Sequence, residues 1–581
     1  MVSKGYIPSW RAIAAATILL TLQGCAGLSN LTGGSRGGET PYGDYLAARY
    51  ASAVHETDEA NKYFDKTLAV DPDNPVVIER AFMVSLNGGD MGRAVRLARR
   101  LIKISPDHRM GRLVLALNDI NNRDYKDAQK QIGSAESGVF VALVGSLTQS
   151  WAAAGDGDKD LALAKLKAFE NKPAFDLFRT YHKALILDML GDAKEAEDSY
   201  RQAMDSSGGT SIRIVESYAS FLSRQGRQNE ARAALDQYAA LAPDHPLVRS
   251  ALARLNKGDV LKPLVSTAAE GVAEALYGLG SALAQDSGNE LAGLYLQLAI
   301  WLRPDFNVAH TLLADTYEQK KRWADAIAAY SRVSKDSPLY QNARIQTALD
   351  LDRLDKQPEA IAVLRAYAAD NPNAIEPMVA LGDIYRSKEN YAEAAAQYSH
   401  AIEVAGKTAP SHWSLYYARG ICNERLGKWS DAERDLKTAL KLSSDHPLVL
   451  NYLGYSWIEQ GAHLKEALAM IEKAVELRPT DGFIVDSLGW AHYRLGDYAR
   501  AVQVLQRAVE LEPDDSTIND HLGDAFWKVG RKIEARFQWS HALEMKPEKD
   551  RIEVLKAKLE FGLEAGEATQ RHQPPTAPRG S

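Results

Sequence analysis

Residues 449–482 read VLNYLGYSWIEQGAHLKEALAMIEKAVELRPTDG, residues 483–516 read FIVDSLGWAHYRLGDYARAVQVLQRAVELEPDDS, and residues 517–550 read TINDHLGDAFWKVGRKIEARFQWSHALEMKPEKD. Together they make the stretch Leu448–Pro547 three copies of one pattern of 34 residues. Each copy has a glycine, an alanine about a dozen residues later, and a proline twelve residues after the alanine. The glycines are Gly454, Gly489 and Gly523, the alanines Ala467, Ala501 and Ala535, and the prolines Pro479, Pro513 and Pro547.

This pattern resembles the tetratricopeptide repeat, in which two antiparallel helices and a turn recur along the chain. Small residues at the glycine and alanine positions let two helix backbones approach closely. A large residue three places after the glycine, which is Trp457, His492 or Phe526, fills the remaining gap. One such unit cannot bury its apolar face alone, so the repeats must stack into a solenoid. The sequence therefore predicts an all-α, right-handed superhelix.

The alanine also marks the phase of the repeats through the rest of the chain. Most steps between successive alanines are 34 residues, and the series gives about fourteen repeats. The markers are Ala60, Ala94, Ala128, Ala162, Ala196, Ala231, Ala292, Ala326, Ala360, Ala394, Ala432, Ala467, Ala501 and Ala535. They define an N-terminal repeat arm over residues 44–255 and a C-terminal repeat arm over residues 268–549.

The step from Ala231 to Ala292 is 61 residues, which is neither one period nor two. Within it, residues 256–267 (NKGDVLKPLVST) carry Gly258 and Pro263 and have no helical stripe. We interpret this segment as a hinge or irregular crossing between the two arms. The alternative is one continuous superhelix with a distorted repeat.

After the last repeat, residues 550–566 are apolar on one face and charged on the other, as expected of a capping helix at an open solenoid end. The remaining residues, 567–581, include a proline-rich stretch and are predicted to be disordered.

The first 24 residues have the pattern of a signal peptide. Lys4 and Arg11 precede an uncharged apolar run from Ala12 to Leu22. The run ends in Leu22-Gln23-Gly24-Cys25, which resembles the bacterial lipobox, where cleavage occurs before a cysteine that is then acylated. We expect lipidation at Cys25. The alternative is an ordinary secretory signal followed by a chance cysteine.

Residue 26 is alanine and not aspartate, so no inner-membrane retention signal is evident. We expect an outer-membrane lipoprotein that faces the periplasm, with the membrane bound through its N-terminal lipid. Residues 25–43, rich in glycine, serine and threonine, are predicted to be a flexible tether that spans about 25 Å on average.

Net charge and cysteine content exclude some classes of partner and of covalent bond. The 581 residues carry a formal net charge of −7, and removal of Lys4 and Arg11 with the signal leaves −9. A chain with this balance lacks the basic face that nucleic acid requires, so no nucleic-acid partner is expected. If Cys25 is acylated, Cys422 has no disulfide partner and is expected to be a buried small residue.

The sequence contains no recognisable set of catalytic residues. The thirteen histidines are scattered, with no HExxH and no Cys/His cluster at zinc spacing. There is no GxSxG, no P-loop and no GxGxxG after a strand. We therefore expect no enzyme activity, no metal and no cofactor, and a long surface for protein partners instead.

In the repeat frame, the groove is lined by residues three before, one after and four after the glycine of each first helix. In the last three repeats these positions are Asn451, Tyr455, Ile458, Asp486, Trp490, Tyr493, Asp520, Asp524 and Trp527. Aromatic residues here would clamp a peptide, with Asn451 holding its backbone. The alternative is that Trp490 and Trp527 only pack between neighbouring helices. Trp457, Phe526 and Trp539 fall on packing positions.

The last three repeats also carry a closer resemblance. They are similar to the C-terminal part of the LbcA type of bacterial repeat lipoprotein, which partners periplasmic C-terminal processing proteases at the outer membrane and has NlpI as a functional analogue. The matching residues include Asn451, Leu453, Gly454, Tyr455, Asp486, Ser487, Gly489, Trp490, Tyr493, Gly496, Leu522, Gly523 and Trp527. The resemblance covers about 100 of the 581 residues.

The resemblance implies an adaptor that binds the protease, recruits cell-wall hydrolases and so controls peptidoglycan remodelling. The alternative is a structural scaffold or assembly factor of an envelope complex for secretion or polysaccharide export. Stable co-purification with membrane channel subunits would distinguish this scaffold from the adaptor.

Overall fold

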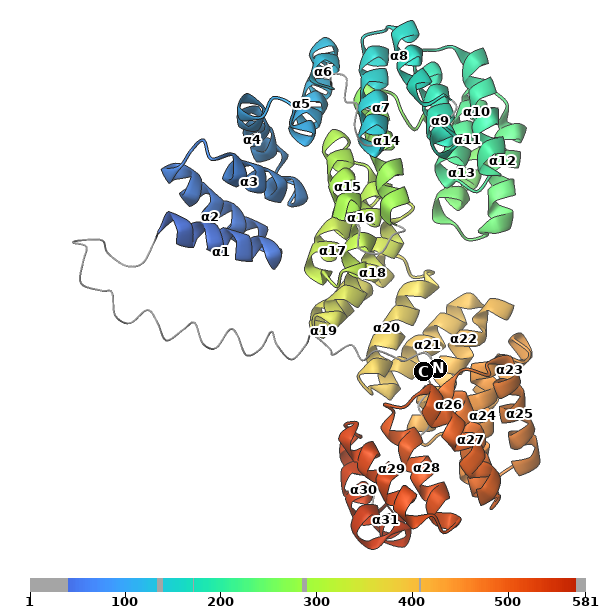
Figure 1. The fold of residues 1–581 in the computed structure, drawn as a ribbon. Helices are drawn as coiled ribbons and strands as arrows, with labels where there is room; N and C mark the ends of the chain where they lie inside the picture. Colours follow the sequence, from blue (N-terminus) through green and yellow to red (C-terminus); the bar gives the residue numbers. More distant parts are fainter. Residues whose placement is uncertain (1–39, 133–138, 171, 285–289, 407–408, 571–581) are drawn as a thin grey trace, which may run out of the picture. The chain divides into compact units, whose positions relative to one another are not determined.

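The computed structural model describes residues 40–132, 139–170, 172–284, 290–406 and 409–570 (Figure 1). These residues form α-helices and short 3₁₀ turns and contain no strand. The predicted signal peptide, Cys25 and the tether as far as residue 39 lie outside the described residues. In the described part, no helix combines the length and the apolar character needed to cross a membrane.

The helices are short and follow one another along the chain. The first half contains α1 (Pro41–Ala53), α2 (Thr57–Val70), α3 (Pro75–Asn87), α4 (Met91–Ile104), α5 (Arg109–Asn121), α6 (Tyr125–Ile132), α7 (Val139–Gly155), α8 (Lys159–Leu166), α9 (Pro173–Met189), α10 (Ala193–Ser207), α11 (Ile212–Arg224), α12 (Gln228–Leu241), α13 (Pro246–Asn256), α14 (Ala268–Ala284) and α15 (Glu290–Leu302).

The second half contains α16 (Asn307–Gln319), α17 (Trp323–Tyr330), α18 (Tyr340–Arg353), α19 (Gln357–Asp370), α20 (Ile375–Ser387), α21 (Tyr391–Ala405), α22 (Trp413–Arg425), α23 (Trp429–Leu442), α24 (Pro447–Gln460), α25 (Leu464–Leu477), α26 (Gly482–Arg494), α27 (Tyr498–Leu511), α28 (Ser516–Lys528), α29 (Lys532–Glu544), α30 (Lys549–Phe561) and α31 (Leu563–Gln570).

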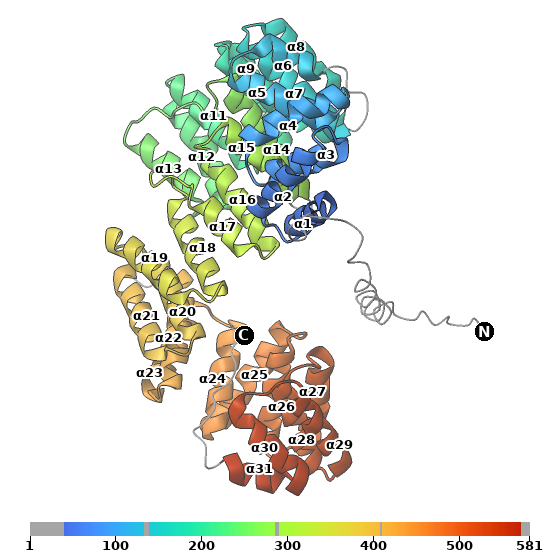
Figure 2. The same cartoon turned by 90° about the vertical axis from the view of Figure 1, so that its left-hand side faces the viewer.

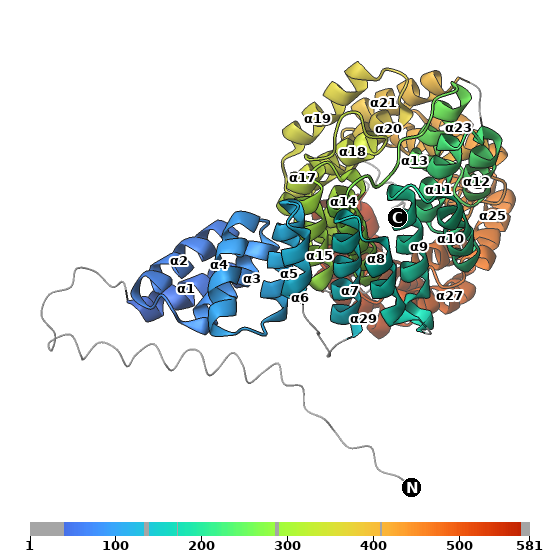
Figure 3. The ribbon, with the colours of Figure 1, turned by 90° about the horizontal axis from the view of Figure 1, so that it is seen from above.

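Consecutive helices pack as pairs, as α1 with α2 and α26 with α27 do. The first three pairs, α1 to α6, follow one another in Figure 3, and the last helices, α28 to α31, do so in Figure 2. All fourteen alanines that mark the repeats lie inside helices and are 0% exposed. An alanine that is this deeply buried leaves no room for a larger side chain, so the repeat phase sets the helix spacing. The predicted tetratricopeptide-repeat solenoid is confirmed.

The chain divides into two compact units. The first unit holds the described residues up to Tyr238, together with Val260–Gly280 and Gln297–Pro304. The second unit holds Ala239–Asp259, Ser281–Leu296 and the described residues from Asp305 onward. This division differs from the predicted arms, because residues 260–280 belong with the N-terminal repeats.

The predicted hinge, residues 256–267, is helical only at Asn256, the last residue of α13. Its part from Val260 onward lies against the first unit. The backbone N–H of Leu261 donates to Ser223, and the Ser220 hydroxyl donates to the Lys262 carbonyl. The side chains of Leu261 and Val265 are buried. Since both backbone and side chains are held, this part of the segment is packed structure.

The ends of the repeat region also differ from expectation. The predicted capping helix over residues 550–566 is two helices, α30 and α31, because Gly562 adopts φ 99°, a conformation that ends a helix. Residues 567–570 of the predicted tail belong to α31, and residues 571–581 lie outside the described residues. At the other end, α1 begins at Pro41, inside the predicted tether, with Thr40 capping it.

Candidate functional site

The first helices of the last three repeats are held by their glycines. A Cβ atom on Gly454 would lie 2.9 Å from the carbonyl oxygen of Ala467, and one on Gly523 would lie 3.1 Å from that of Ala535. A Cβ on Gly489 would meet the Leu505 side chain at 2.5 Å. The glycine-bearing face of each first helix therefore packs against the second helix of the same repeat.

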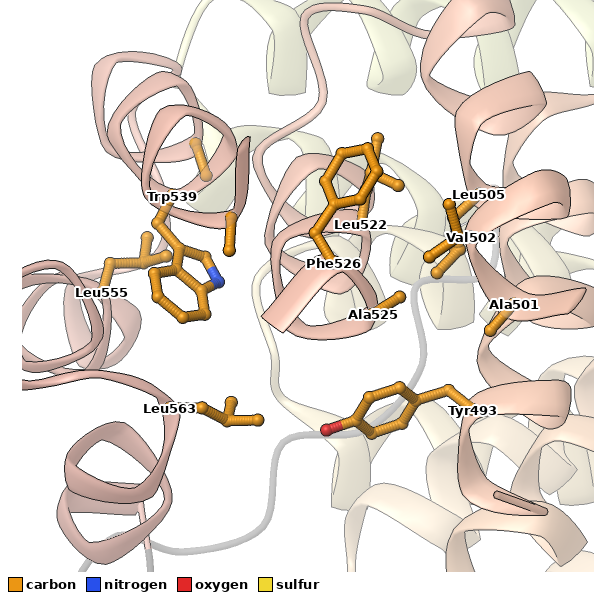
Figure 4. Close-up of a cluster of buried hydrophobic side chains, with 12 residues drawn as sticks. Tyr493, Ala501, Val502, Leu505, Leu522, Ala525, Phe526, Trp539, Leu555 and Leu563 are labelled. Carbon is orange, nitrogen blue, oxygen red and sulfur yellow. The ribbon is translucent and has the colours of Figure 1, made fainter. Parts of the chain in front are cut away.

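Behind these contacts lies a shared core. Figure 4 shows side chains from α26 to α31 converging, among them Phe526, Trp539, Leu555 and Leu563. Trp457 is also buried, so the three aromatics predicted to be structural are core residues. Cys422 is buried as expected, and burial raises the pKa of its thiol to about 12.

A pocket of about 140 Å³ opens between the first helices of neighbouring repeats. Its walls come from α24, α26, α28 and the start of α30. They are formed by Tyr455, Glu459, Phe483, Asp486, Ser487, Trp490, Asp515, Ser516, Thr517, Ile518, Asp520, His521, Asp524, Pro547, Glu548, Arg551 and Leu555. Five of the predicted groove residues line it: Tyr455, Asp486, Trp490, Asp520 and Asp524.

Trp490 is the centre of an aromatic stack. Its ring lies 4.6 Å from that of Tyr493 at an interplanar angle of 8°, and 4.0 Å from that of His521 at 16°. The indole N–H donates to a carboxylate oxygen of Glu459 at 2.6 Å. Arg494 donates to the same oxygen at 2.8 Å. Trp490 is thus held in orientation where it lines the pocket.

The histidine in this stack was not predicted from the sequence. His521 is buried, and its Nδ1 lies 3.0 Å from both carboxylate oxygens of Asp486. Burial lowers the pKa of His521, but the charge and hydrogen bond of Asp486, with Asp520 and Asp524 nearby, outweigh it and raise the pKa overall. In the sequence, His521 lies between Asp520 and Asp524, two predicted groove residues, and this position could have identified it.

The other side of the pocket is an ion network from two elements. The Lys558 ammonium lies 2.6 Å from Asp520 and 2.7 Å from Asp524, and it is 2% exposed. Arg551 forms a second ion pair with Asp520. The indole N–H of Trp539 donates to Asp524 at 2.9 Å.

The two aspartates differ in charge preference. Burial opposes ionisation of Asp520, but Lys558 and Arg551 lower its pKa to about 2. Burial dominates at Asp524 and, despite the attraction of Lys558, raises its pKa to about 6. One carboxylate is firmly ionised, and the other is close to taking a proton near neutral pH.

The remaining groove predictions do not line the pocket. Tyr493 stacks against Trp490 and is buried, as is Ile458. Asn451 is half-buried and does not contribute to the lining. Trp527 is covered by the C-terminal helices, since a Cβ on Gly562 would lie 2.5 Å from its ring. Trp527 is half-buried against this end of the chain, and its groove role stays a prediction.

Within the described residues, no group of three or more His, Cys, Asp or Glu side chains is arranged to hold a metal ion. The pocket is lined by aromatic side chains, carboxylates and one guanidinium.

Comparisons with known proteins agree with the repeat fold. A family model described as "Tetratricopeptide repeat" matches residues 309–375, 379–435 and 424–482, and a second one so described matches residues 189–255. A model described as "TPR repeat" matches residues 489–530, which span α26 to α28.

Among curated proteins, the TPR repeat-containing protein PA4667 of Pseudomonas aeruginosa is 29% identical over 197 residues, which are 34% of this chain and 32% of that protein. The BBSome complex member BBS4 of Bos taurus is 30% identical over 110 residues, 18% of this chain and 21% of that protein. The chain thus spans less than a third of the length of either relative.

Among solved structures, the APC/C hetero-tetramer Cut9–Hcn1 is 15% identical with a TM-score of 0.37, covering 91% of this chain and 96% of that one. The helix pairs, the buried marker alanines and the matching family models agree on the fold. The chain has the fold of a tetratricopeptide-repeat solenoid, a scaffold for protein–protein interaction.

Proposed function

We propose that this protein is a lipid-anchored adaptor of the bacterial envelope. Its last three repeats bind a protein partner, and the adaptor brings substrate proteins, cell-wall hydrolases, to a C-terminal processing protease. The observation that carries the proposal is the pocket that unites Tyr455, Asp486 and Trp490 from two repeats. These three residues also belong to the set on which the family resemblance rests.

The size of the pocket favours a side chain of a protein over a small-molecule ligand. At about 140 Å³ it is smaller than the roughly 300–1,000 Å³ typical of small-molecule sites. A preorganised aromatic such as Trp490, held by stacking and by a hydrogen bond, is the usual kind of anchor at a protein interface.

The proposed anchor adds a second element. A lipid on Cys25 and a flexible tether would confine the repeats near the outer membrane, on the periplasmic side. Confinement of protease and substrate on one scaffold raises their effective concentration without new chemistry. This accounts for a function in proteolysis without a catalytic residue.

Photocrosslinking in cells tests the binding site. A photoreactive residue at Thr517, which is exposed and lines the pocket, is expected to trap a C-terminal processing protease or a cell-wall hydrolase. The matched control is Gln506 on α27, which is exposed and does not line the pocket. Equal trapping at both positions, or trapping of secretion-complex subunits at Thr517, contradicts the adaptor proposal.

Reconstitution tests the activity. The purified full chain is expected to accelerate cleavage of a hydrolase substrate by the protease, and Trp490→Ala is expected to lose most of this effect. Trp527→Ala is the matched control, because that tryptophan packs on the chain's own C-terminal helices. The adaptor proposal fails if the wild-type chain leaves the cleavage rate unchanged.

Cell fractionation tests the anchor separately. Cys25→Ala is expected to move the protein from the outer-membrane fraction to a soluble fraction, since acyl chains supply about 0.8 kcal/mol per buried CH₂. A Cys422→Ala variant is the control, because Cys422 is buried in the repeat core. Membrane association that survives Cys25→Ala contradicts lipidation at this position.

A further inference from the structure

Groove positions of repeats four to six are covered by the chain itself. Repeats four to six have Ser150, Ala184 and Ala219 at the glycine position, twelve residues before their marker alanines. The groove positions of their first helices, α7, α9 and α11, follow from the same frame. They include Leu147, Trp151, Tyr181, Glu216, Ser220 and Ser223. Residues 261–279, from the extended segment and α14, lie at five of these positions, all except Glu216.

The extended part of this segment is held through its backbone. Leu261 N–H donates to the Ser223 hydroxyl at 3.1 Å, and the Ser220 hydroxyl donates to the Lys262 carbonyl at 2.6 Å. Both serines are groove positions of repeat six. Backbone hydrogen bonds to groove side chains are how a solenoid binds an extended peptide irrespective of its sequence.

The helical part fits closely against α7 and α9. A Cβ on Gly271 would lie 2.3 Å from the ring of Trp151, and one on Gly278 would lie 3.0 Å from the ring of Phe178. Leu147 of α7 and Leu276 of α14 line the same small apolar cavity. Figure 1 shows α14 alongside α7. Glycines at these points allow the helix to sit directly on the aromatic rings.

A single charged residue fixes the register. Glu274 is buried in the middle of α14, and its carboxylate accepts two hydrogen bonds from Arg213, at 2.8 and 2.6 Å. The Tyr181 hydroxyl donates to the same carboxylate at 3.3 Å. A two-pronged guanidinium–carboxylate pair is both strong and directional.

Ordinary stacking does not produce these contacts. In a solenoid each repeat touches its immediate neighbours, whereas residues 261–279 touch the groove positions of repeats four, five and six. The contacts combine an extended stretch bound through its main chain with a helix that buries one charged side chain, Glu274, as in the binding of a helix to a groove.

We propose that the concave face of α7, α9 and α11 is a helix-binding groove, and that its resident ligand is segment 261–279 of the same chain. The groove selects an alanine- and glycine-rich helix with a buried carboxylate near its centre. While the segment is in place, this groove is closed to partners. The proposal does not depend on the adaptor function.

The test uses the full chain and a fluorescent peptide that consists of residues 259–284. Gly271→Leu is expected to displace α14, because its side chain cannot fit over Trp151. The peptide is then expected to bind this variant at least tenfold more tightly than it binds the wild-type chain. Gly293→Leu is the matched control, since the nearest atom to a Cβ there is 3.9 Å away.

Two further variants establish specificity. A peptide with Glu274→Lys, and a Gly271→Leu chain that also carries Arg213→Met, are each expected to weaken binding at least tenfold. Circular dichroism and hydrogen exchange must show that the loss of structure in Gly271→Leu is confined to residues 261–280. A folded variant of this kind that does not bind the peptide overturns the proposal.

If Gly271→Leu does not fold, Glu274→Lys in the full chain replaces it, because it sets an ammonium against Arg213 without a change in backbone space. Peptide binding to that variant supports the proposal. If neither variant folds, the segment is an integral part of the core, and the groove proposal is wrong.

Discussion

Trp151 and Trp490 occupy the same place in the repeat, one residue after the glycine position, yet their surroundings are opposite. Trp151 is 0% exposed beneath Gly271, and its indole N–H donates to Nδ1 of His182 at 3.1 Å. Burial lowers the pKa of His182 to about 4, which keeps that nitrogen an acceptor. Trp490 is half-buried, stacks on His521 and faces the pocket.

The comparison shows that repeat position alone does not decide whether a groove residue binds a partner. The groove residues of both regions come from first helices, but α14 covers one set and leaves a paired Glu274–Arg213 inside. In the C-terminal region the pocket is open. There Asp486 pairs with His521, and Asp520 and Asp524 pair with Lys558 and Arg551. The following variants test this difference, from the largest expected effect to the smallest.

The largest effect is expected from Glu274→Ala in the first unit. It leaves the Arg213 guanidinium largely buried without its main partner, and loss of one member of a buried pair typically costs about 3–5 kcal/mol. Hydrogen exchange of α9, α11 and α14 measures the loss locally, since a solenoid does not unfold as one unit. Glu59→Ala, in an exposed pair with Lys62, is the control and should change stability by less than about 1 kcal/mol. Unchanged protection of α14 in Glu274→Ala would mean that the pair does not hold the helix.

A smaller effect is expected from Lys558→Met in the second unit. Arg551 remains on Asp520, and Asp524, whose pKa is already about 6, can take a proton when its cation is lost. We expect a loss of about 2–3 kcal/mol at pH 8, below the usual range for a broken buried pair. A raised carboxyl pKa favours the folded state at low pH, so the loss should shrink at pH 5. Hydrogen exchange of α28 and α30 at both pH values gives the answer, and a loss independent of pH would contradict protonation of Asp524.

His521→Gln is expected to change the pH dependence of stability. The raised pKa of His521 contributes stability that is fully present below its unfolded value of about 6.5 and is lost as pH rises through the folded value. One group contributes at most about 1.4 kcal/mol per pH unit. Urea midpoints for the C-terminal repeats, measured from pH 5.5 to 8.5, should therefore fall more steeply in the wild-type chain than in the variant. Parallel curves would exclude His521 as the titrating group.

The smallest effect on stability is expected from Trp490→Phe. The ring can still stack on Tyr493 and His521, but the hydrogen bond to Glu459 is lost. That bond is exposed, so the expected change is within about 1 kcal/mol. Partner crosslinking from Thr517 should nevertheless fall, because phenylalanine replaces the larger indole that lines the pocket. If crosslinking is full in Trp490→Phe and absent in Trp490→Ala, the partner needs only an aromatic ring at this position and not the indole.

Much of the fold was predictable because the repeat phase is a local signal. The interval between marker alanines indicated where each second helix lies, and Ala60 at one end is as deeply buried as Ala535 at the other. The break at Gly562 was less evident, since the hydrophobic stripe continues through it and only the positive φ ends α30.

The site was predictable only in part. The frame found Trp490 and the three aspartates, because they lie at fixed offsets from a glycine. It does not identify His521, which lines the pocket, or Lys558, which binds two of its aspartates, because these contacts join residues 34 to 38 positions apart in the sequence. The same offset gives Trp151 in repeat four, where serine stands in place of glycine and its hydroxyl donates a hydrogen bond to the Ala162 carbonyl. The packing of α14 is non-local and has no counterpart in the repeat pattern.

The position of α14 also has a mechanical consequence. A stack of helix pairs is elastic, because each interface between neighbouring repeats (a joint) can open slightly when the two ends are pulled apart. Segment 261–279 packs on Trp151 and hydrogen-bonds to Tyr181 and Ser220, so it spans two successive joints and prevents them from opening separately. Under tension, this part of the molecule should yield in a single abrupt step at high force, whereas unbraced repeats extend gradually.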